Sequence, residues 1–301
     1  MGLGSIAAGE ICVTRRWISL AVLLLILISC AALGSWPRFI SRMFGRGRRR
    51  GKDIVAIYGN IPEAKRVICI MAHYDTKSSL LPFGIRVSMM WLAILFLFSS
   101  SLLILSGLCS WAKAFSITAG IFGIALSIDI PQNKSPGAID NASGLGIMME
   151  IGRTVSSHKP EGLGVIFVAT DAEEEGMIGA LRFVEYLKGS LLFRPDISFL
   201  NIDISSGSRW VGISGRRGGM AKGVANAMRE EGLRPIPIPL VGAGADHIPA
   251  MWHGFDAITV HGLGSISDLF RIHTWMDLPG SLLPDGMERI GRAIVRWIFK
   301  M

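Results

Sequence analysis

Polar side chains that could bind a metal follow several apolar runs of the sequence. His73 and Asp75 come directly after the apolar run Val67–Ala72, and the acids Glu173 to Glu175 follow another run that ends at Thr170. Residues two apart at a strand end point the same way, so Asp75 can accept a hydrogen bond from one ring nitrogen of His73 and leave the other for a metal. Adjacent buried carboxylates repel each other unless a cation neutralises them. Taken singly, however, these motifs also fit a structural histidine and a solvated acidic face.

Three further residues extend this set. Asp140 lies in a turn that precedes a helix-like stretch, where by itself it or Asn141 could simply cap the helix. Asp203 ends another apolar run, and His273 begins the segment HTWMD. Because ligands bind outside the carboxyl ends of strands in open α/β sheets, one sheet edge can collect residues that lie far apart in the sequence. Two histidines and three or four carboxylates suit a hydrolytic zinc site, and their number suits two ions bridged by a carboxylate.

The chain resembles the co-catalytic di-zinc aminopeptidases, the family that also includes glutamate carboxypeptidase and glutaminyl cyclase relatives. The resemblance rests on five segments that occur in the order AHYD, GAIDNASG, DAEEEG, NID and IHTWMD. It covers residues 54–79 and 134–299. It implies that two zinc ions share the carboxylate of Asp140 as a bridge. The other implied ligands are His73 and Asp203 on one ion, and Glu174 and His273 on the other.

The resemblance also implies roles for two residues that do not bind metal. Glu173 would be the catalytic general base, and Asp75 would be the hydrogen-bond partner of the first histidine ligand. Asp246 and His247 follow Ala245, where the family has a serine, so neither is included in the expected ligand set.

The rest of the sequence predicts an α/β fold, because short β-branched runs alternate with helix-like stretches from Asp53 onward. We expect a three-layer α/β/α sandwich with a mixed, mainly parallel central sheet. The expected strands are Ile54–Tyr58, Val67–Ala72, Gly164–Ala169, Ser198–Asp203 and Ala257–Val260. The expected helices are Ala142–Ser157, Met177–Lys188, Gly219–Glu231 and Pro284–Phe299.

Three uncharged stretches predict membrane-spanning helices. Residues 17–37 are long enough to cross the ~30 Å hydrocarbon core of a bilayer. Residues 87–112 and 114–128 would form an inserted helical hairpin, with its turn around residues 109–113. The alternatives are a secretory signal with a lipoprotein-like processing site at Cys30 for the first stretch, and buried core helices for the hairpin.

The positive charge of the chain is concentrated after the first of these stretches. The formal net charge is +8, and Pro37–Lys52 holds seven basic residues and no acid. Such a short run does not form the broad basic surface that nucleic acid requires, so we expect no nucleic-acid partner. We expect three transmembrane helices. By the positive-inside rule, this basic run predicts that the catalytic domain lies in the cytoplasm. A chain that is 50% hydrophobic and 18% charged is not a disordered one.

These observations predict one domain organisation. It comprises an N-terminal segment with a transmembrane helix (1–36), a basic linker (37–52), a metallopeptidase domain (53–84 and 131–301) and an inserted transmembrane hairpin (85–130).

The expected function is zinc-dependent peptide hydrolysis, most simply by an aminopeptidase. Because the hairpin is inserted between the implied ligands His73 and Asp140, the active site should lie close to the membrane surface. The expected partners are a peptide substrate and a lipid bilayer, and the oligomeric state is left open. The alternatives are a non-catalytic binding protein on the same fold and a carboxypeptidase or cyclotransferase of the same family.

Overall fold

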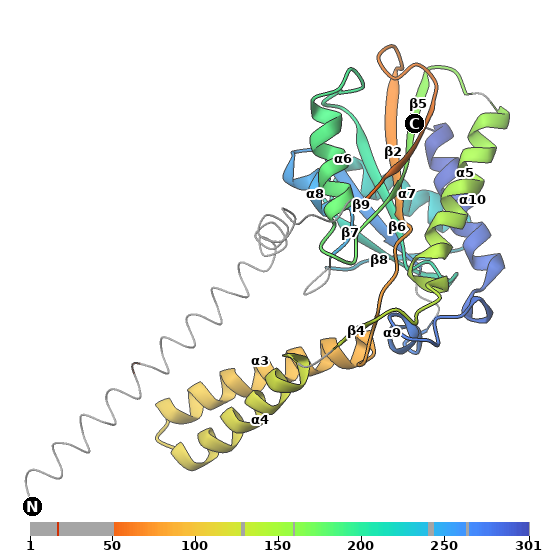
Figure 1. Ribbon diagram of the computed structural model, residues 1–301. Helices are drawn as coiled ribbons and strands as arrows, with labels where there is room; N and C mark the ends of the chain where they lie inside the picture. Colours follow the sequence, from red (N-terminus) through yellow and green to blue (C-terminus); the bar gives the residue numbers. More distant parts are fainter. Residues whose placement is uncertain are drawn as a thin grey trace, which may run out of the picture. The chain divides into compact units, whose positions relative to one another are not determined.

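A seven-stranded mixed sheet forms the centre of the larger of two units (Figure 1). The structure is a computed structural model that describes residue 17 and residues 51–127, 130–158, 160–239, 244–262 and 265–300. One unit contains Phe83–Ile130, and the other contains Pro131–Met301 together with the described part of Pro37–Pro82. The predicted first transmembrane stretch, apart from Trp17, lies outside the described residues, as does nearly all of the basic linker.

The sheet has the strand order β1-β5-β2-β6-β9-β7-β8. Its strands are β1 (Ile54–Tyr58), β2 (Arg66–His73), β5 (Leu163–Thr170), β6 (Ser198–Asp203), β7 (Trp210–Gly215), β8 (Arg234–Pro237) and β9 (Asp256–His261). β2 pairs in parallel with β5 and β6, β6 pairs in parallel with β9, and β7 with β8. β1 is antiparallel to β5, and β7 is antiparallel to β9. The predicted α/β fold with a mixed sheet is confirmed, and all five predicted strands are present.

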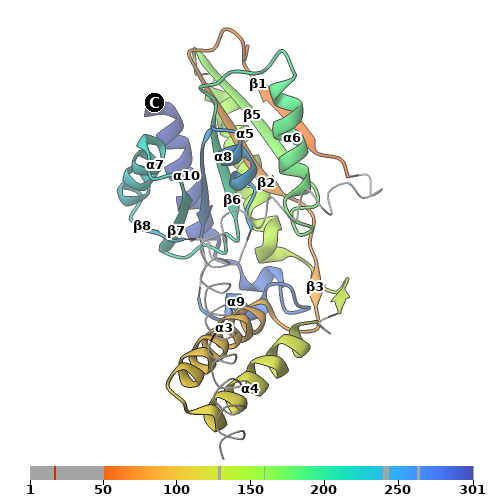
Figure 2. The ribbon, with the colours of Figure 1, turned by 90° about the vertical axis from the view of Figure 1, so that its left-hand side faces the viewer.

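Helices cover both faces of this sheet, as Figure 2 shows for α6, α7 and α10. The helices on one face are α5 (Ser143–His158), α7 (Gly219–Glu230) and α10 (Pro284–Lys300). Those on the other face are α6 (Ile178–Lys188) and α8 (His247–Trp252). The short α9 (Asp268–Arg271) lies in the segment before α10.

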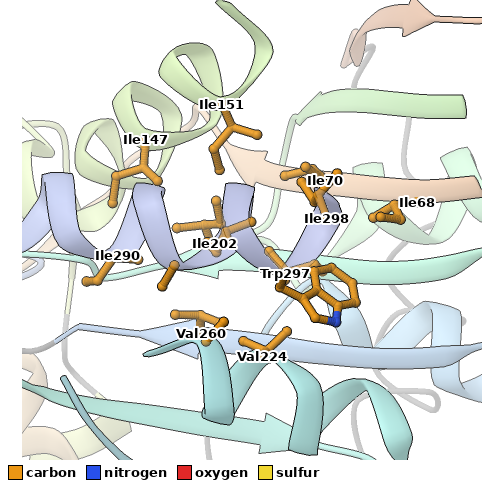
Figure 3. Close-up of a cluster of buried hydrophobic side chains, with 14 of the residues drawn as sticks. Ile68, Ile70, Ile147, Ile151, Ile202, Val224, Val260, Ile290, Trp297 and Ile298 are labelled. Atoms are coloured by element: carbon orange, nitrogen blue, oxygen red, sulfur yellow. The ribbon is translucent and has the colours of Figure 1, made fainter. Parts of the chain in front are cut away.

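The buried residues of β2 show how the strands bind both helical layers. Because successive side chains of a strand point to opposite faces, Ile68 and Ile70 pack under α5 and α10, whereas Cys69 and Met71 pack on the α6 side. Figure 3 shows the apolar core between the sheet and α5, α7 and α10, in which Trp297 of α10 packs with the other labelled side chains. A strand buried on both faces reads as a continuous apolar run, which is why β2 was evident in the sequence.

The described residues of the smaller unit form a helical hairpin of α3 (Phe83–Leu105) and α4 (Cys109–Ser127). The Phe96 ring packs edge-on against the Phe115 ring, with centroids 5.1 Å apart, and the Ser100 hydroxyl donates to the carbonyl oxygen of Ala112 at 2.9 Å. By length and composition, both helices are apolar enough to cross a membrane.

The predicted turn of this hairpin at residues 109–113 is wrong, because that segment is helical and the chain turns at Ser106–Leu108. Gly107 has a φ of 80° and ends α3. The N–H of Leu108 donates to the carbonyl oxygen of Leu103 at 2.8 Å, and that of Gly107 donates to Ile104 at 3.1 Å, an arrangement that commonly ends helices at glycine. With 19 residues, α4 is about 28 Å long and therefore matches a bilayer core.

A second, two-stranded sheet joins the two ends of the insertion. Its strands are β3 (Ser78–Ser79), which precedes α3, and β4 (Pro131–Gln132), which follows α4. The N–H of Lys134 also donates to the hydroxyl oxygen of Ser78 at 2.7 Å. Both strands belong to the larger unit, so that unit contains the chain segments from which the hairpin departs and to which it returns.

Candidate metal centre

The carboxyl ends of three neighbouring parallel strands meet at one edge of the sheet. His73 is the last residue of β2 and is paired in register with Thr170, the last residue of β5. Asp203 is the last residue of β6, on the other side of β2. Glu173 and Glu174 follow β5 within four residues of its end. The edge where ligands bind in α/β sheets thus collects four of the predicted site residues.

Asp140 reaches this edge from the kinked turn η1 (Ala138–Ala142), which leads into α5. The carboxylate of Asp277 holds the turn, because it accepts the N–H of Ile139 at 2.6 Å and the N–H of Asp140 at 3.2 Å. The peptide bond between Asp140 and Asn141 is cis.

Asn141 ties the same turn to β6 and to the start of α5. Its side-chain amide donates to the carbonyl oxygen of Ile202 at 2.9 Å, and its side-chain oxygen accepts the N–H of Gly144 at 3.2 Å. A Cβ at position 144 would overlap both Asn141 and the Ile202 carbonyl, so only glycine permits this approach. Asn141 therefore caps the helix, and the carboxylate of Asp140 is left for other contacts.

His273 comes from the segment between α9 and α10. Its φ of 62° lies in the left-handed region, which is uncommon for histidine and marks a position that the surrounding structure constrains. Its carbonyl oxygen accepts the N–H of Ser79 in β3 at 3.0 Å. The strand from which the hairpin departs therefore fixes the backbone of this histidine.

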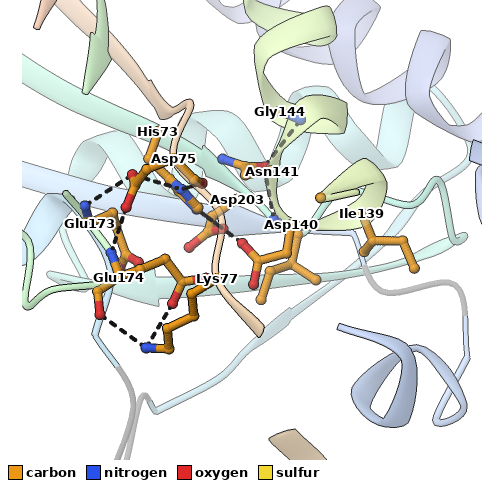
Figure 4. A network of polar contacts seen from close by, with 12 residues as sticks. His73, Asp75, Lys77, Ile139, Asp140, Asn141, Gly144, Glu173, Glu174 and Asp203 are labelled. Carbon is orange, nitrogen blue, oxygen red and sulfur yellow. Dashed lines mark hydrogen bonds and ion pairs between the residues drawn. The ribbon is translucent and has the colours of Figure 1, made fainter. Parts of the chain in front are cut away.

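Five side chains converge into two groups that share Asp140, and Figure 4 labels all of them except His273. One group is His73, Asp140 and Asp203, the other is Asp140, Glu174 and His273, and the ligand atoms within each lie within 4.8 Å of one another. Oδ1 of Asp140 is 3.1 Å from Nε2 of His73, and Oδ2 is 3.0 Å from Nε2 of His273. Each oxygen of one carboxylate thus belongs to a different group.

The second contact of each histidine completes its group. Nε2 of His73 is 3.3 Å from Oδ1 of Asp203, and Nε2 of His273 is 2.8 Å from Oε1 of Glu174. All five predicted ligands therefore lie in the two groups, in the arrangement of two ligand sets joined by one carboxylate.

Burial and mutual contact shift the pKa values of these groups in opposite directions. Burial by itself would lower the pKa of His273, but hydrogen bonds with Asp140 and Glu174 outweigh it and raise that pKa to about 9. Burial is likewise outweighed at His73, where contacts with Asp140 and Asp203 raise the pKa well above its usual range. Burial would raise the pKa of Asp140, yet the two histidines hold it well below its usual range. Three carboxylates this close require positive charge between them, from protons on the histidines or from metal ions.

Asp75 holds the end of β2 and the acidic segment together (Figure 4). With its proton on Nδ1, His73 donates to the backbone carbonyl oxygen of Asp75 at 3.0 Å, while the nearer carboxylate oxygen is 3.5 Å away. That carboxylate instead accepts the N–H of Glu173 at 3.1 Å and the N–H of Glu174 at 3.2 Å. Asp75 thus positions Glu173 and Glu174 as well as His73. The sequence hypothesis included only its contact with His73.

Glu173 lies beside the two groups and is a member of neither in the described part of the chain. Burial raises its pKa well above the usual range; the charge of His73 opposes this shift, and the charge of Asp246 adds to it. A half-buried carboxylate with a raised pKa next to metal-binding side chains suits proton transfer near neutral pH.

Lys77 is a contact of the centre that sequence reasoning missed. Its ammonium group lies 3.0 Å from Oε2 of Glu174 and donates to the backbone carbonyl oxygen of Glu174 at 2.9 Å (Figure 4). It therefore occupies one oxygen of this carboxylate, and the other oxygen faces His273. A lysine one residue before β3 carries no signal of this role in the sequence itself.

Asp246 and His247, excluded from the predicted ligand set, are buried near this centre. The hydroxyl of Thr170 donates a short hydrogen bond to Asp246, and burial raises the pKa of Asp246 to about 7. Nδ1 of His247 is 2.6 Å from the hydroxyl oxygen of Thr259, and burial lowers the pKa of His247 to about 3. Among the described residues, neither belongs to the two metal-binding groups.

Comparison with known proteins gives this geometry a family context. The family described as Peptidase family M28 matches residues 53–298. Aminopeptidase YwaD from Bacillus subtilis (strain 168) is 30% identical over 131 residues, which are 41% of this chain and 28% of that relative. The chain thus matches little more than a quarter of that protein's length.

Solved structures of low sequence identity share the fold. The LapA aminopeptidase of Legionella pneumophila superposes with a TM-score of 0.60 at 14% identity, covering 97% of this chain and 73% of that one. The zinc aminopeptidase BSAP from Bacillus subtilis superposes with a TM-score of 0.56 at 18% identity, covering 82% of this chain and 49% of that one.

Proposed function

Since the chain belongs to peptidase family M28, we propose that it is a zinc-dependent peptide hydrolase, specifically an aminopeptidase that uses two metal ions and a glutamate general base. The observation that carries the proposal is the shared carboxylate of Asp140, whose two oxygens lie 3.1 Å and 3.0 Å from two different histidines. A single structural ion pair would have no need of two imidazoles and two further carboxylates around one aspartate.

The donor atoms of the two groups fit zinc. Imidazole nitrogens and carboxylate oxygens are the ligands of hydrolytic zinc sites. His73 donates its Nδ1–H to the carbonyl oxygen of Asp75, and such a hydrogen bond commonly orients a histidine that binds zinc through its other ring nitrogen. His73 and Asp203 would hold one ion, Glu174 and His273 the other, and Asp140 both.

The chain's own residues would supply the proton transfers and their positioning. Bound zinc would polarise the scissile carbonyl group and lower the pKa of water from about 15.7 toward about 7. Glu173 would take the proton of the attacking water and deliver it to the leaving amine. Asp75 holds the backbone of Glu173 at 3.1 Å, and Lys77 pairs with one oxygen of Glu174, so that the other, which faces His273, would be available to a metal.

We place this reaction at a membrane surface. The length and composition of α3 and α4 support this location, as does their insertion between β3 and β4, strands of the catalytic unit that pair with each other. The basic run from Pro37 to Lys52 favours a cytoplasmic catalytic unit, with residues 17–37 as a third span.

Turnover by the detergent-purified full chain tests the proposal. An aminoacyl chromogenic substrate should be hydrolysed, the activity should be lost with a chelator, and zinc should restore it. A peptide panel with free and blocked ends should show cleavage that requires a free N-terminus. Cleavage that requires a free C-terminus would indicate a carboxypeptidase, cyclisation of an N-terminal glutamine would indicate a cyclotransferase, and bound zinc without turnover would indicate a binding protein.

A further inference from the structure

The segment that carries His273 has a mainly apolar outer surface. Residues 265–283, here called the His273 loop, run from the chain before α9 to the start of α10. Of its charged residues, only Arg271 is not buried. Its large exposed side chains are Ile266, Phe270, Trp275, Met276, Leu278 and Leu283.

The acids of the His273 loop are turned inward. Asp268 is buried and accepts the hydroxyl hydrogen of Ser206 at 2.8 Å, and Asp277 is buried against the turn that holds Asp140. Arg271 pairs with Asp268 at 3.4 Å. The loop therefore uses its acids for internal contacts and presents mainly apolar groups to its surroundings, together with the Arg271 side chain, which is 40% exposed.

Two of these apolar side chains are largely exposed. Ile266 is 77% exposed and Trp275 is 66% exposed. Single exposed apolar residues are normal on soluble proteins, but several large ones within one short segment are typical of an interaction surface.

Covalent connection limits how far this loop can lie from the membrane that the hairpin would enter. The N–H of Ser79 donates to the carbonyl oxygen of His273 at 3.0 Å, which fixes the loop beside β3. From Ser79 the chain takes four residue steps to Phe83, where α3 begins, and four steps span at most about 14 Å. Leu80, the first residue on this path, is also exposed.

We propose that the His273 loop and Leu80 lie in the headgroup region of the bilayer that holds the hairpin, so that the lipid surface is the partner of this apolar face. Tryptophan at this level is typical of membrane interfaces, and a face whose one exposed charge, Arg271, is paired with Asp268 binds mainly by apolar burial and not by attraction to anionic lipid. The substrates would then be peptides already bound at the lipid surface; this last consequence rests on the proposed peptidase activity, whereas the lipid contact does not.

A fluorescent label at Ile266 tests the contact. The full chain carries Ile266→Cys with Cys12, Cys30 and Cys109 replaced by serine, and Cys69 is kept because it is fully buried. The bimane-labelled protein is reconstituted in phosphatidylcholine vesicles with and without lipid brominated in its acyl chains. The control is Leu191→Cys, which is 95% exposed and precedes β6 at the opposite edge of the sheet.

Bimane at position 266 should lose roughly half or more of its emission in brominated vesicles, since interfacial segments insert ~5–10 Å, while bimane at position 191 should lose none. The loss should persist at high salt and without anionic lipid. Equal loss of emission at both positions would overturn the proposal. A change in the emission of position 266 that appears only as the protein concentration rises would also overturn it, because a second copy of the chain would then cover the loop. The thermal unfolding transition of the same samples reports folding, and hydrolysis of a soluble aminoacyl chromogenic substrate reports activity. Quenching in folded protein without hydrolysis would reject the peptidase proposal alone.

Discussion

Asp277→Asn should lower the Tm of the protein, because Asp277 holds the turn that carries Asp140. The Asp277 carboxylate accepts backbone N–H groups at 2.6 Å and 3.2 Å with its two oxygens, and it is fully buried. Asparagine offers one oxygen, and its amide group would then face an N–H with no acceptor. The loss of one hydrogen bond to a charged acceptor costs about 1.5–3 kcal/mol, and the unsatisfied buried donor adds about 1–3 kcal/mol.

Part of this cost is offset, because burial disfavours the ionised carboxylate and raises the pKa of Asp277 to about 6 despite its backbone hydrogen bonds. Replacing it with a neutral amide relieves that desolvation. We therefore expect a net loss of about 2 kcal/mol, which lowers the Tm of a domain of this size by roughly 4–8 °C.

The assay is thermal unfolding of the detergent-purified protein together with its zinc content, which should fall because Asp140 loses its fixed backbone. The matched control is Asp196→Asn, whose exposed carboxylate pairs with Arg194 at 2.7 Å and should contribute less than about 1 kcal/mol. An Asp277→Asn protein with the Tm and the zinc content of wild type would refute this account of how the turn is held.

Three other perturbations separate the roles within the centre. Glu173→Gln should keep its bound zinc and lose on the order of a hundredfold or more in kcat, because only the proton acceptor is removed; unchanged turnover would reject Glu173 as the base. Asp140→Asn should deplete both ions, since its two oxygens face two ligand groups, and elemental analysis that still finds two ions would rule out the bridge. In metal-free protein the pKa of His273 is raised from 6.5 to about 9, so its stabilising contribution is complete below pH 6.5 and is lost as the pH rises toward 9. The Tm of chelator-treated protein should therefore fall across this window more steeply than that of zinc-loaded protein, and parallel curves would contradict the His273 contacts.

The strands that carry the centre could be predicted because they are buried on both faces. β6 has the bounds that the sequence indicated, and β2 and β5 extend one residue further at each end. β7 and β8 were not predicted, since β7 contains Gly212 and β8 contains Pro235 and Pro237, residues that weaken any strand signal. β8 can hold these prolines because it is an edge strand of the sheet.

The hairpin turn was misplaced for a related reason. Lys113 is the first charged residue between the two apolar stretches, but a lysine can be accommodated in a helix. Gly107 in the left-handed region is what ends α3, and a lone glycine within an apolar stretch gives only a weak signal.

The contacts that support the centre could not be found from the sequence, because they join segments that approach only in the fold. Lys77 and Glu174 are 97 residues apart, and Asp277 and Ile139 are 138 residues apart. His73, Asp203 and Glu174 could be identified because each ends or follows an apolar strand, and parallel strands bring such ends together. Asp140 and His273 lie outside the strands and were assigned as ligands by the resemblance of their segments to the family.

Zinc content is the measurement that tests the central claim most directly. Elemental analysis of the purified full chain, after removal of loosely bound metal by dialysis, should find two zinc ions for each chain, because the two ligand groups share one carboxylate. Protein that is folded by its unfolding transition yet holds no stoichiometric metal would contradict the assignment of these five side chains to a metal centre.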